Sequence, residues 1–367
     1  MIELFKVFMG ENVLAAVSRT LYSGYVGQGP KVEEFEKKLS GYIGNDLCLA
    51  LNSATSGLTL ALRLIGVEGG EVITTPLTFV ATNWAILACG AKPVWCDVNP
   101  WTCNIDPDKI ESLINEKTKA VMIVDWGGMP CNLEEITGLC RKYHLPLIED
   151  AAQAFGAEYR GQKVGNFADY TVFSFQAIKH LTCVDGGALF LNDQKQYERG
   201  KLLRWYGIDR NERKDFRCEV DISEWGYKFH MNDLAATIGL SNLAYVDWIL
   251  SKHRDNAAYY DKELKGVPGV KLLQPGTWAN WKVSSCWLYT IRVERRDDFR
   301  RMMNEEGIAV ARVHERNDRY SCMAQWWYER DLPGLEELTK EMICIPVGWW
   351  VSESDRQYIV DAIKKGW

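Results

Sequence analysis

The stretch KAVMIVDWGGMPCNLEEITGLCRKYHLPLIED, residues 119–150, indicates how the chain folds. An apolar, β-rich run at Lys119–Val124 predicts a buried strand, and Asn132–Tyr143 has apolar residues at helical spacing. A second apolar run, Leu145–Ile148, predicts another strand. Strand, helix and strand at this spacing are typical of a largely parallel sheet covered by helices. Because ligands bind at the carboxyl ends of the strands in such sheets, candidate site residues are expected directly after each strand.

Similar patterns occur on both sides of this stretch. Two further strands are predicted at Tyr170–Phe175 and Gly187–Leu191, and Asn52–Gly57 precedes an apolar helix at Leu58–Ile65. These elements predict an α/β fold in which a mostly parallel central sheet carries helices on both faces.

The texture of the sequence changes in the last third of the chain. A long helix is predicted over Ala244–Lys265, followed by strands at Val270–Leu273 and Cys286–Val293. We therefore expect a large domain over residues 1–245, which includes the N-terminal segment, and a smaller α+β domain over residues 246–367.

The composition excludes several classes of protein. The 367 residues are 47% hydrophobic, and a net charge of −6 leaves no basic excess for nucleic acid. No apolar run is long enough for a membrane span, and the N-terminal residues lack the pattern of a secretory signal. Eleven cysteines without a Cys-x-x-Cys pair indicate reduced thiols in a cytoplasmic protein, and the five histidines form no metal motif, so no metal is expected. The 15 Trp, 16 Tyr and 12 Phe indicate packed cores, stacking sites or a large interface.

Two ionisable residues follow predicted strands. Asp150 is either a solvated carboxylate or helix cap, or a carboxylate that faces a cationic ligand atom. Lys179 lies in the loop between the predicted strands Tyr170–Phe175 and Gly187–Leu191. A lone lysine is usually a surface residue, but a partly buried one has a lowered pKa and can become a nucleophilic amine that forms an imine.

The segment Asn52-Ser-Ala-Thr-Ser-Gly57 opens a helix with small and hydroxylated residues. It is either an ordinary capped helix start or an anion site, because the N–H groups and dipole of a helix start favour phosphate. Together with Asp150 and Lys179 it fits pyridoxal 5′-phosphate, whose aldehyde bonds a lysine and whose ring nitrogen a carboxylate keeps protonated. Phe79 is the candidate to cover the ring face, the alternative being a plain core phenylalanine.

With these residues the chain resembles the DegT/DnrJ/StrS family of nucleotide-sugar aminotransferases, in the fold-type I class of pyridoxal-phosphate enzymes. The resemblance runs through most of the chain and is carried by the joint order and spacing of its motifs: Gly29–Glu36, Asn52–Leu58, Thr75–Thr82, Glu149–Gly156, Ser174–Leu181 with Asp185–Gly187, and Gly226–Leu234 with Ala236–Leu240.

The resemblance implies a role for each matching residue. Lys179 is the expected Schiff-base lysine, and Asp150 the expected partner of the pyridinium nitrogen. The cofactor alternates with pyridoxamine 5′-phosphate during the reaction. The other expected cofactor contacts are Gln153 to the 3′-oxygen, Phe79 to the ring, and three residues to the phosphate: Thr55, Ser56 and Ser174.

The chain departs from the commonest family pattern in a few places. The family forms homodimers with shared active sites, which implies that the Gly226–Asp233 loop reaches the partner's site. That loop reads Gly-Tyr-Lys-Phe-His where Gly-Tyr-Asn-x-Arg is common, so Lys228 is expected to meet the phosphate as a point charge. Asp125 stands where a histidine is common, which concerns the substrate or local packing rather than the cofactor.

The resemblance also implies a reaction. L-Glutamate is the expected amino donor, and the acceptor is a nucleotide-linked keto-deoxy sugar, 3-keto or 4-keto and 6-deoxy, made for a surface glycan such as lipopolysaccharide or for a secondary metabolite. Substrate contacts are expected from Tyr25, Arg312, His314 and Arg316; the alternatives are a solvated charged loop and a structural histidine. No nucleic acid or membrane partner is expected.

Two other functions stay open at this point. One is a pyridoxal-phosphate-dependent sugar dehydratase or lyase of the same fold. Related dehydratases carry histidine at the Schiff-base position, so Lys179 favours aminotransfer. The other is a non-catalytic relative that only binds the cofactor, and the presence of Lys179, Asp150 and Gln153 argues against it.

Overall fold

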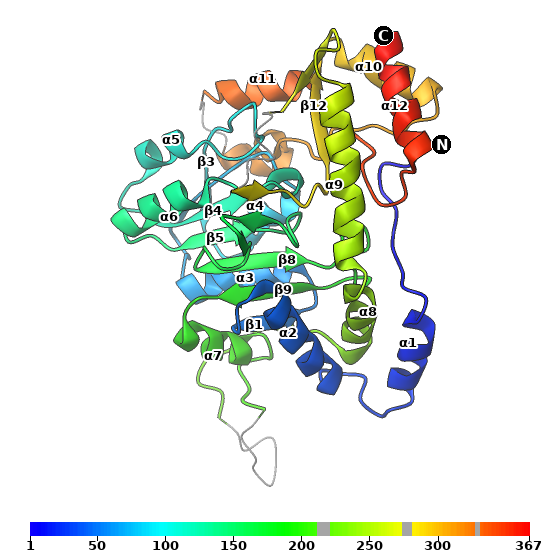
Figure 1. Ribbon diagram of the computed structural model, residues 1–367. Coiled ribbons are helices and arrows are strands. Elements are labelled where there is room, and N and C mark those ends of the chain that lie inside the picture. Colours follow the sequence, from blue (N-terminus) through cyan, green and yellow to red (C-terminus); the bar gives the residue numbers. More distant parts are fainter. Residues whose placement is uncertain (211–220, 274–280, 327–330) are drawn as a thin grey trace.

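The computed structural model describes residues 1–210, 221–273, 281–326 and 331–367. Its centre is a seven-stranded sheet (Figure 1). The strands lie in this order across the sheet: β1 (Cys48–Leu51), β9 (Gly187–Leu191), β8 (Tyr170–Ser174), β5 (Leu147–Asp150), β4 (Thr118–Val124), β2 (Glu71–Thr74) and β3 (Lys92–Trp95). Only β9 pairs antiparallel with its neighbours, which confirms the predicted mostly parallel sheet.

Helices cover both faces of this sheet. One face carries α2 (Pro30–Ile43), α6 (Leu133–Lys142), α8 (Asp233–Leu243) and α9 (Val246–Glu263), and the other carries α3 (Ala54–Ile65), α4 (Val80–Ala88) and α7 (Gln194–Leu203). Along β4, Val121 and Ile123 pack with α6 while Ala120 and Met122 pack with α3 and α4. Each such aliphatic side chain contributes about 1.5–3 kcal/mol when fully buried, so both layers are needed.

The decisive stretch folds as predicted, with one informative difference. The first strand and the helix match their predicted ranges to within one residue at either end. The second strand, β5, begins at Leu147, two residues later than predicted, and ends with the acidic pair Glu149-Asp150. Asp150 is therefore the last residue of the strand, paired in register with Val124 of β4 and Val172 of β8.

The C-terminal part has its own antiparallel sheet and core. The sheet has the order β10 (Val270–Leu272), β12 (Tyr289–Val293), β13 (Met342–Ile345), and its core includes α10 (Arg296–Glu305) and α12 (Glu353–Lys365). The remaining elements are α1 (Val13–Leu21), α5 (Pro107–Ile110), α11 (Pro333–Glu341), β6 (Glu158–Tyr159), β7 (Gln162–Lys163), β11 (Lys282–Val283) and short 3-10 helices such as η2 (Trp126–Gly128).

The two ends of the chain meet on this C-terminal part (Figure 1). Ile2 forms a bridge with Ile308, and its N–H donates to the carbonyl of Gly307 at 2.8 Å. The first residues thus pack on the C-terminal unit although they precede the large sheet in sequence. The division at residues 245 and 246 stays a prediction.

Two general expectations can be compared with the described residues. The ten cysteines described there are free thiols, and nearly all are buried. No single helix of the described ranges is long and apolar enough to cross a membrane; α8 and α9 meet that criterion only as a pair bent by 58°.

Candidate active site

The carboxyl ends of β2, β4, β5 and β8 bring the predicted site residues to one edge of the sheet. Asp150 ends β5, Ser174 ends β8, and Thr75 follows β2. Because these strands are parallel, all the segments that follow them begin at the same edge.

Asp150 lies at this edge with its carboxylate almost fully buried, 4% exposed. Thr82 donates its hydroxyl to Oδ2 at 2.6 Å, and the N–H of Ala152 donates to Oδ1 at 3.1 Å. Burial raises the pKa of Asp150, while both hydrogen bonds and the charge of Lys179 oppose that rise. The result is a buried carboxylate suited to pair with a cationic ligand atom.

Sequence reasoning missed Thr82. It lies in the motif Thr75–Thr82, four residues after Thr78, with which it shares a 2.8 Å hydrogen bond. That spacing on one helical turn was the available signal, but nothing in it pointed to Asp150, 68 residues away.

Lys179 follows β8 in a turn in which its own N–H donates to the carbonyl of Gln176 at 3.0 Å. Burial lowers the pKa of its amine to about 7, and the negative charge of Asp150 acts in the opposite direction. About half of the amine is therefore uncharged at neutral pH. An uncharged amine beside a buried carboxylate is the arrangement that imine chemistry requires.

The start of α3 lies against the end of the sheet. Ser53 caps the helix, and its Oγ accepts the N–H of Ser56 at 3.1 Å. A Cβ on Gly187 would come within 2.6 Å of the Ser53 and Ala54 backbone, so only glycine lets β9 approach the helix so closely. Ser174 pairs with Gly187 in the ladder, which places its side chain beside this helix start.

The helix start treats two of the predicted phosphate contacts, Thr55 and Ser56, differently. The N–H of Ser56 is already used by the cap, whereas the N–H groups of Ala54 and Thr55 stand in the first turn, where the helix itself offers no acceptor. A phosphate at this end would thus meet the N–H of Thr55 rather than that of Ser56. The hydroxyl of Ser56 also donates to Asn52 Oδ1 at 2.6 Å.

Gln153 is held from two sides beside Asp150. The N–H of Gly127 in η2 donates to its Oε1 at 2.7 Å, which fixes the orientation of the amide. Its Nε2 lies 3.2 Å from Nε2 of His314. Since an amide nitrogen can only donate, His314 accepts there as a neutral ring. Burial, followed by the charge of Lys179, lowers the pKa of His314 to about 3, in agreement with that role.

Three aromatic rings lie around His314, on the side of the site where it contacts Gln153. Phe79, 57% exposed, lies with its ring centre 5.5 Å from that of His314. Trp126 meets His314 edge-on at 5.5 Å, and Trp287 lies nearly parallel to it at 6.3 Å. Phe79 is thus exposed at the site, and its assignment to the ring face stays a prediction. Sequence reasoning missed Trp126 and Trp287, which come from distant segments.

Lys228 lies beside the same helix start in its own chain. The carbonyl of Lys228 accepts from Asn52 Nδ2 at 3.1 Å, and the carbonyl of Phe229 accepts from the Asn52 N–H at 2.7 Å. These bonds attach the 228–230 segment to the end of β1, next to the predicted phosphate position.

The four predicted substrate residues are not brought together. His314 lies against Gln153, as described above. Arg316 is buried, with its guanidinium bonded to both oxygens of Asp318 at 2.8 and 2.6 Å and to Glu336. Arg312 pairs with Glu315, and Tyr25 is 64% exposed on the segment between α1 and α2. The roles of Tyr25, Arg312 and Arg316 in substrate binding stay predictions, and the bonds of Arg316 give it a structural task.

Asp125 is fully buried and turned away from this edge. The N–H of Cys131 donates to its Oδ1 at 2.9 Å. Burial raises the pKa of Asp125 to about 6, and burial together with the charge of Asp125 raises that of Glu149 above its usual range. Both carboxyl groups are therefore easier to protonate than an exposed carboxylate. Of the two meanings left open for Asp125, the structure therefore supports local packing.

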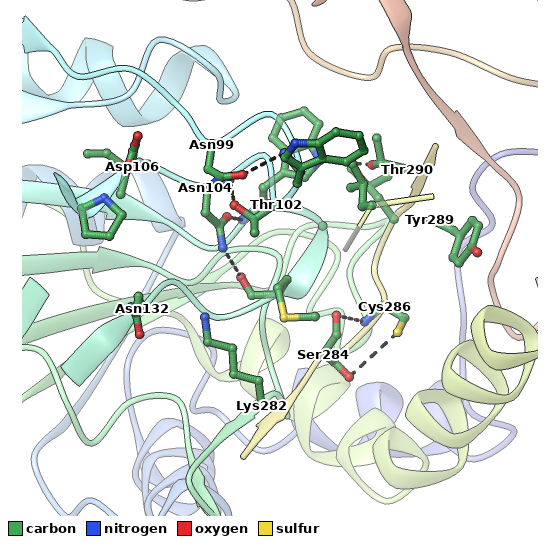
Figure 2. Close-up of a pocket in the computed structure, with 18 of the residues that line it drawn as sticks. Asn99, Thr102, Asn104, Asp106, Asn132, Lys282, Ser284, Cys286, Tyr289 and Thr290 are labelled. Atoms are coloured by element: carbon green, nitrogen blue, oxygen red, sulfur yellow. Dashed lines mark hydrogen bonds between the residues drawn. The ribbon is translucent and has the colours of Figure 1, made fainter. Parts of the chain in front are cut away.

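A separate cavity of about 670 Å³ lies behind η2 (Figure 2). Trp126 and Gly127 line this cavity and also contact His314 and Gln153, respectively. Figure 2 shows the side chain of Lys282 extending into the cavity. Its lining mixes indole rings, amides and carboxylates with this amine, and neither Lys179 nor Asp150 contributes to it.

The residues at the sheet edge fit pyridoxal phosphate. The start of α3 offers unbonded N–H groups for the phosphate, the buried carboxylate of Asp150 suits a protonated ring nitrogen, and Lys179 offers an amine that is partly uncharged. All three belong to the same edge, and Gln153 lies between the carboxylate and His314.

Comparison with known proteins agrees with this site. The profile of the DegT/DnrJ/EryC1/StrS aminotransferase family matches residues 8–364. The chain belongs to this family. It is accordingly a pyridoxal-phosphate-dependent sugar aminotransferase.

The similar proteins span the full length of the chain. The UDP-4-amino-4,6-dideoxy-N-acetyl-beta-L-altrosamine transaminase of Campylobacter jejuni is 33% identical, covering 96% of this chain and 94% of the relative. The crystal structure of AtS13 from Actinomadura melliaura is 45% identical with a TM-score of 0.95, over 100% of this chain and 99% of that one. The sugar aminotransferase CalS13 from Micromonospora echinospora is 41% identical, also with a TM-score of 0.95, over 100% of both chains.

A third solved structure bears on the cofactor. Spr1654 from Streptococcus pneumoniae, solved in PMP and PLP forms, is 27% and 28% identical to this chain with TM-scores of 0.93 and 0.92. The PMP form covers 100% of this chain and 98% of its own. The resemblance inferred from the motifs, the fold-type I architecture and the cofactor are thereby confirmed.

Proposed function

We propose that this aminotransferase transfers the amino group of L-glutamate to a nucleotide-linked 3-keto or 4-keto 6-deoxy sugar. The observation that carries the proposal is the position of Lys179 and Asp150 at one sheet edge, beside the start of α3. The C. jejuni relative, whose name describes a transaminase of a UDP-linked dideoxy sugar, supports the choice of substrate class.

Each of the chain's own residues has a defined task in this proposal. Bound at the site, the cofactor supplies an electron sink for negative charge at the carbon that carries the amino group. Lys179 would hold the cofactor through its amine and, when that amine is free, would act as the base that moves the proton of the donor's Cα. Asp150, steadied by Thr82, holds the ring nitrogen in its charged form.

Gln153 would bind the cofactor's 3′-oxygen with the second hydrogen of its amide. The first hydrogen is directed to His314, and the carbonyl is occupied by Gly127. Phe79 would cover the ring, and Thr55, Ser174 and the N–H groups of α3 would hold the phosphate. The N–H of Ser56 would stay bonded to Ser53 in the helix cap and would not contact the phosphate.

The test of the reaction is a panel of nucleotide-linked 3-keto and 4-keto 6-deoxy sugars, with ¹⁵N-labelled L-glutamate and mass spectrometry of the products. We expect one keto sugar to become an amino sugar that carries ¹⁵N. Consumption of the keto sugar without nitrogen incorporation would instead identify a dehydratase or lyase. Absence of any conversion, with the cofactor bound, would favour a non-catalytic binding protein.

We also infer that the enzyme acts as a homodimer with shared sites. Several large apolar side chains near the 226–230 segment are exposed in the single chain, among them Trp225 at 61% and Tyr206 at 43%. An exposed group of this kind is typical of a protein interface. In the dimer, Lys228 would reach the phosphate of the partner's site.

Mixed dimers test this sharing. Lys179→Ala and Lys228→Ala subunits are each expected to be impaired alone. If the sites are shared, a dimer with one subunit of each kind contains one site with both lysines, and mixing restores activity. If each site is built from one chain, mixing restores none. Light scattering gives the oligomeric state independently.

The cellular setting follows from the same reasoning. The free thiols of the described cysteines agree with a reducing, cytoplasmic location. We propose that the amino sugar serves a surface glycan, such as lipopolysaccharide, or a secondary metabolite. Genetic deletion followed by analysis of cell-surface sugars would check this placement.

A further inference from the structure

The amine of Lys179 has an aromatic neighbour rather than a carboxylate. Its Nζ lies 3.6 Å from the centre of the Trp287 ring. None of the ion pairs found among residues 1–210, 221–273, 281–326 and 331–367 involves this amine, although the charge of Asp150 acts on it. A lysine that will bond a cofactor is thus left without a strong hydrogen-bond acceptor.

Trp287 is fixed to the loop that carries Lys179. Its indole is 4% exposed, and its Nε1–H donates to the carbonyl of Ile178 at 3.0 Å. Phe5 stacks on it at 5.2 Å between ring centres, with 27° between the planes. Because Ile178 directly precedes Lys179, this bond holds the indole beside the backbone from which the Lys179 side chain extends.

The face of an indole attracts an ammonium group through its ring quadrupole, and this attraction strengthens where water is excluded. It differs from an ion pair in two ways. The indole face accepts no strong hydrogen bond, so no such bond has to break before the amine reacts. The indole also stabilises the charged amine more weakly than a carboxylate would.

We propose that Trp287 is a positioning residue for Lys179: its indole face holds the free amine in the site whenever the lysine is not bonded to the cofactor. The inference rests on the proposed role of Lys179 as the lysine that bonds pyridoxal phosphate. It adds that the ring stabilises the protonated amine, and so sets the fraction of Lys179 that is ready to react.

The proposal predicts a larger effect when the ring at position 287 is lost than when a ring is retained. Trp287→Leu keeps an apolar side chain but removes the quadrupole, so the pKa of Lys179 should fall below its value of about 7. We expect a fall of about one unit, which is roughly a tenfold change in the ratio of free to protonated amine at a given pH. Trp287→Phe retains a ring face and should restore most of the difference.

Trp126→Leu is the matched control. Trp126 is as deeply buried as Trp287, also hydrogen-bonds through Nε1, to Thr290, and also contacts His314, but it is not the ring that faces Lys179. Loss of packing in this cluster should therefore act alike in both variants, whereas loss of the ring face should act only in Trp287→Leu.

The measurement is competitive labelling of the cofactor-free protein with trace acetic anhydride over a pH series, with mass spectrometry of the peptide that contains Lys179. The expected result is a lower pKa in Trp287→Leu, a near-normal one in Trp287→Phe and an unchanged one in Trp126→Leu. An unchanged or raised pKa in Trp287→Leu, or an equal shift in Trp126→Leu, overturns the proposal.

Two further results keep the test decisive. If Trp287→Leu does not fold, Trp287→Phe alone must still show a small fall, because its ring binds a cation more weakly than indole does; no fall contradicts the proposal. Since the labelling needs no cofactor or substrate, failure of the sugar panel would count against the proposed function and leave this result intact.

Discussion

Lys179 and Arg316 are both cations enclosed by the protein, and they are treated in opposite ways. Lys179 lies against an indole, and burial lowers its pKa to about 7. Arg316 has every arm of its guanidinium on a carboxylate; although burial alone would lower its pKa, Asp318 and Glu336 raise it above its usual value. Lys179 is therefore partly uncharged and able to react near neutral pH, whereas Arg316 stays charged and is bonded to two carboxylates.

The difference shows that one buried cation has a structural role and the other a reactive role. Arg316 orients a segment that also contains His314 and Asn317, and Asn317 donates to the carbonyl of Thr78 at 2.9 Å. This segment joins the C-terminal part to the loop after β2. Arg316 thus stabilises the segment that borders the site, whereas Lys179 lies within the site.

The largest effect is expected from Lys179→Ala. It removes the amine that bonds the cofactor and moves the proton, so transamination should fall by about 10³-fold or more. Steady-state kinetics with glutamate measures it, and mass spectrometry checks whether borohydride still attaches the cofactor to the protein. Lys282→Ala, which removes another lysine whose pKa burial lowers, should retain activity. Equal losses in the two variants would refute the special role of Lys179.

Arg316→Met tests the other half of the comparison. It removes the buried guanidinium, 5% exposed, that bonds both oxygens of Asp318 and also Glu336. Breaking a buried ion pair by removing one partner costs about 3 kcal/mol or more of unfolding free energy. Urea unfolding measures it. Arg312→Met, which breaks a half-exposed pair with Glu315, should cost at most about 1 kcal/mol. If both variants lose the same stability, the ion pairs of Arg316 stabilise the fold no more than a half-exposed pair does.

The pH dependence of Lys179 gives a smaller effect of known sign. Its pKa is depressed to about 7, so the amine loses its proton as the pH rises through that value. The rate at which cofactor-free protein captures added pyridoxal phosphate covalently should rise roughly tenfold from about pH 6 to about pH 8 and then level off. Stopped-flow absorbance follows the capture. A continued rise to about pH 10 would mean that the amine is an ordinary exposed lysine.

The smallest effect is expected from Thr82→Val. It removes the hydroxyl that donates to Asp150 at 2.6 Å but keeps the side-chain volume. A lost hydrogen bond of this kind costs about 1 kcal/mol, roughly a fivefold loss of activity, and the pKa of Asp150 should rise further. The pH profile of kcat separates this from a packing defect, which would lower activity equally at all pH values. Thr78→Val, one bond removed from the carboxylate, should be milder.

Much of the site could be predicted because it follows from local patterns and strand register. The apolar runs on either side of Asn132–Tyr143 specify parallel strands, and parallel strands bring Asp150 and the loop with Lys179 to one edge. Small hydroxylated residues before Leu58 specify a capped helix start. Each of these signals lies within a few consecutive residues, where propensity and periodicity act.

Other parts could not be predicted, because they depend on contacts between distant segments. Gln153 and His314 are 161 residues apart in sequence, and Trp287 reaches Ile178 across 109 residues. From the sequence, His314 and Arg316 are both expected to contact the substrate. The fold instead directs His314 to Gln153 and Arg316 to Asp318 and Glu336.

The sequence by itself therefore determined the three-layer architecture, the family and the order in which the reactive groups appear, because these depend on periodicity and on short motifs. Only the tertiary structure decided how each reactive group behaves. Burial set the pKa of Lys179, Thr82 and Ala152 took up the two oxygens of Asp150, and an indole from the C-terminal part met the amine. A protonation state depends on desolvation and on neighbouring charges, and both exist only after distant segments have packed together.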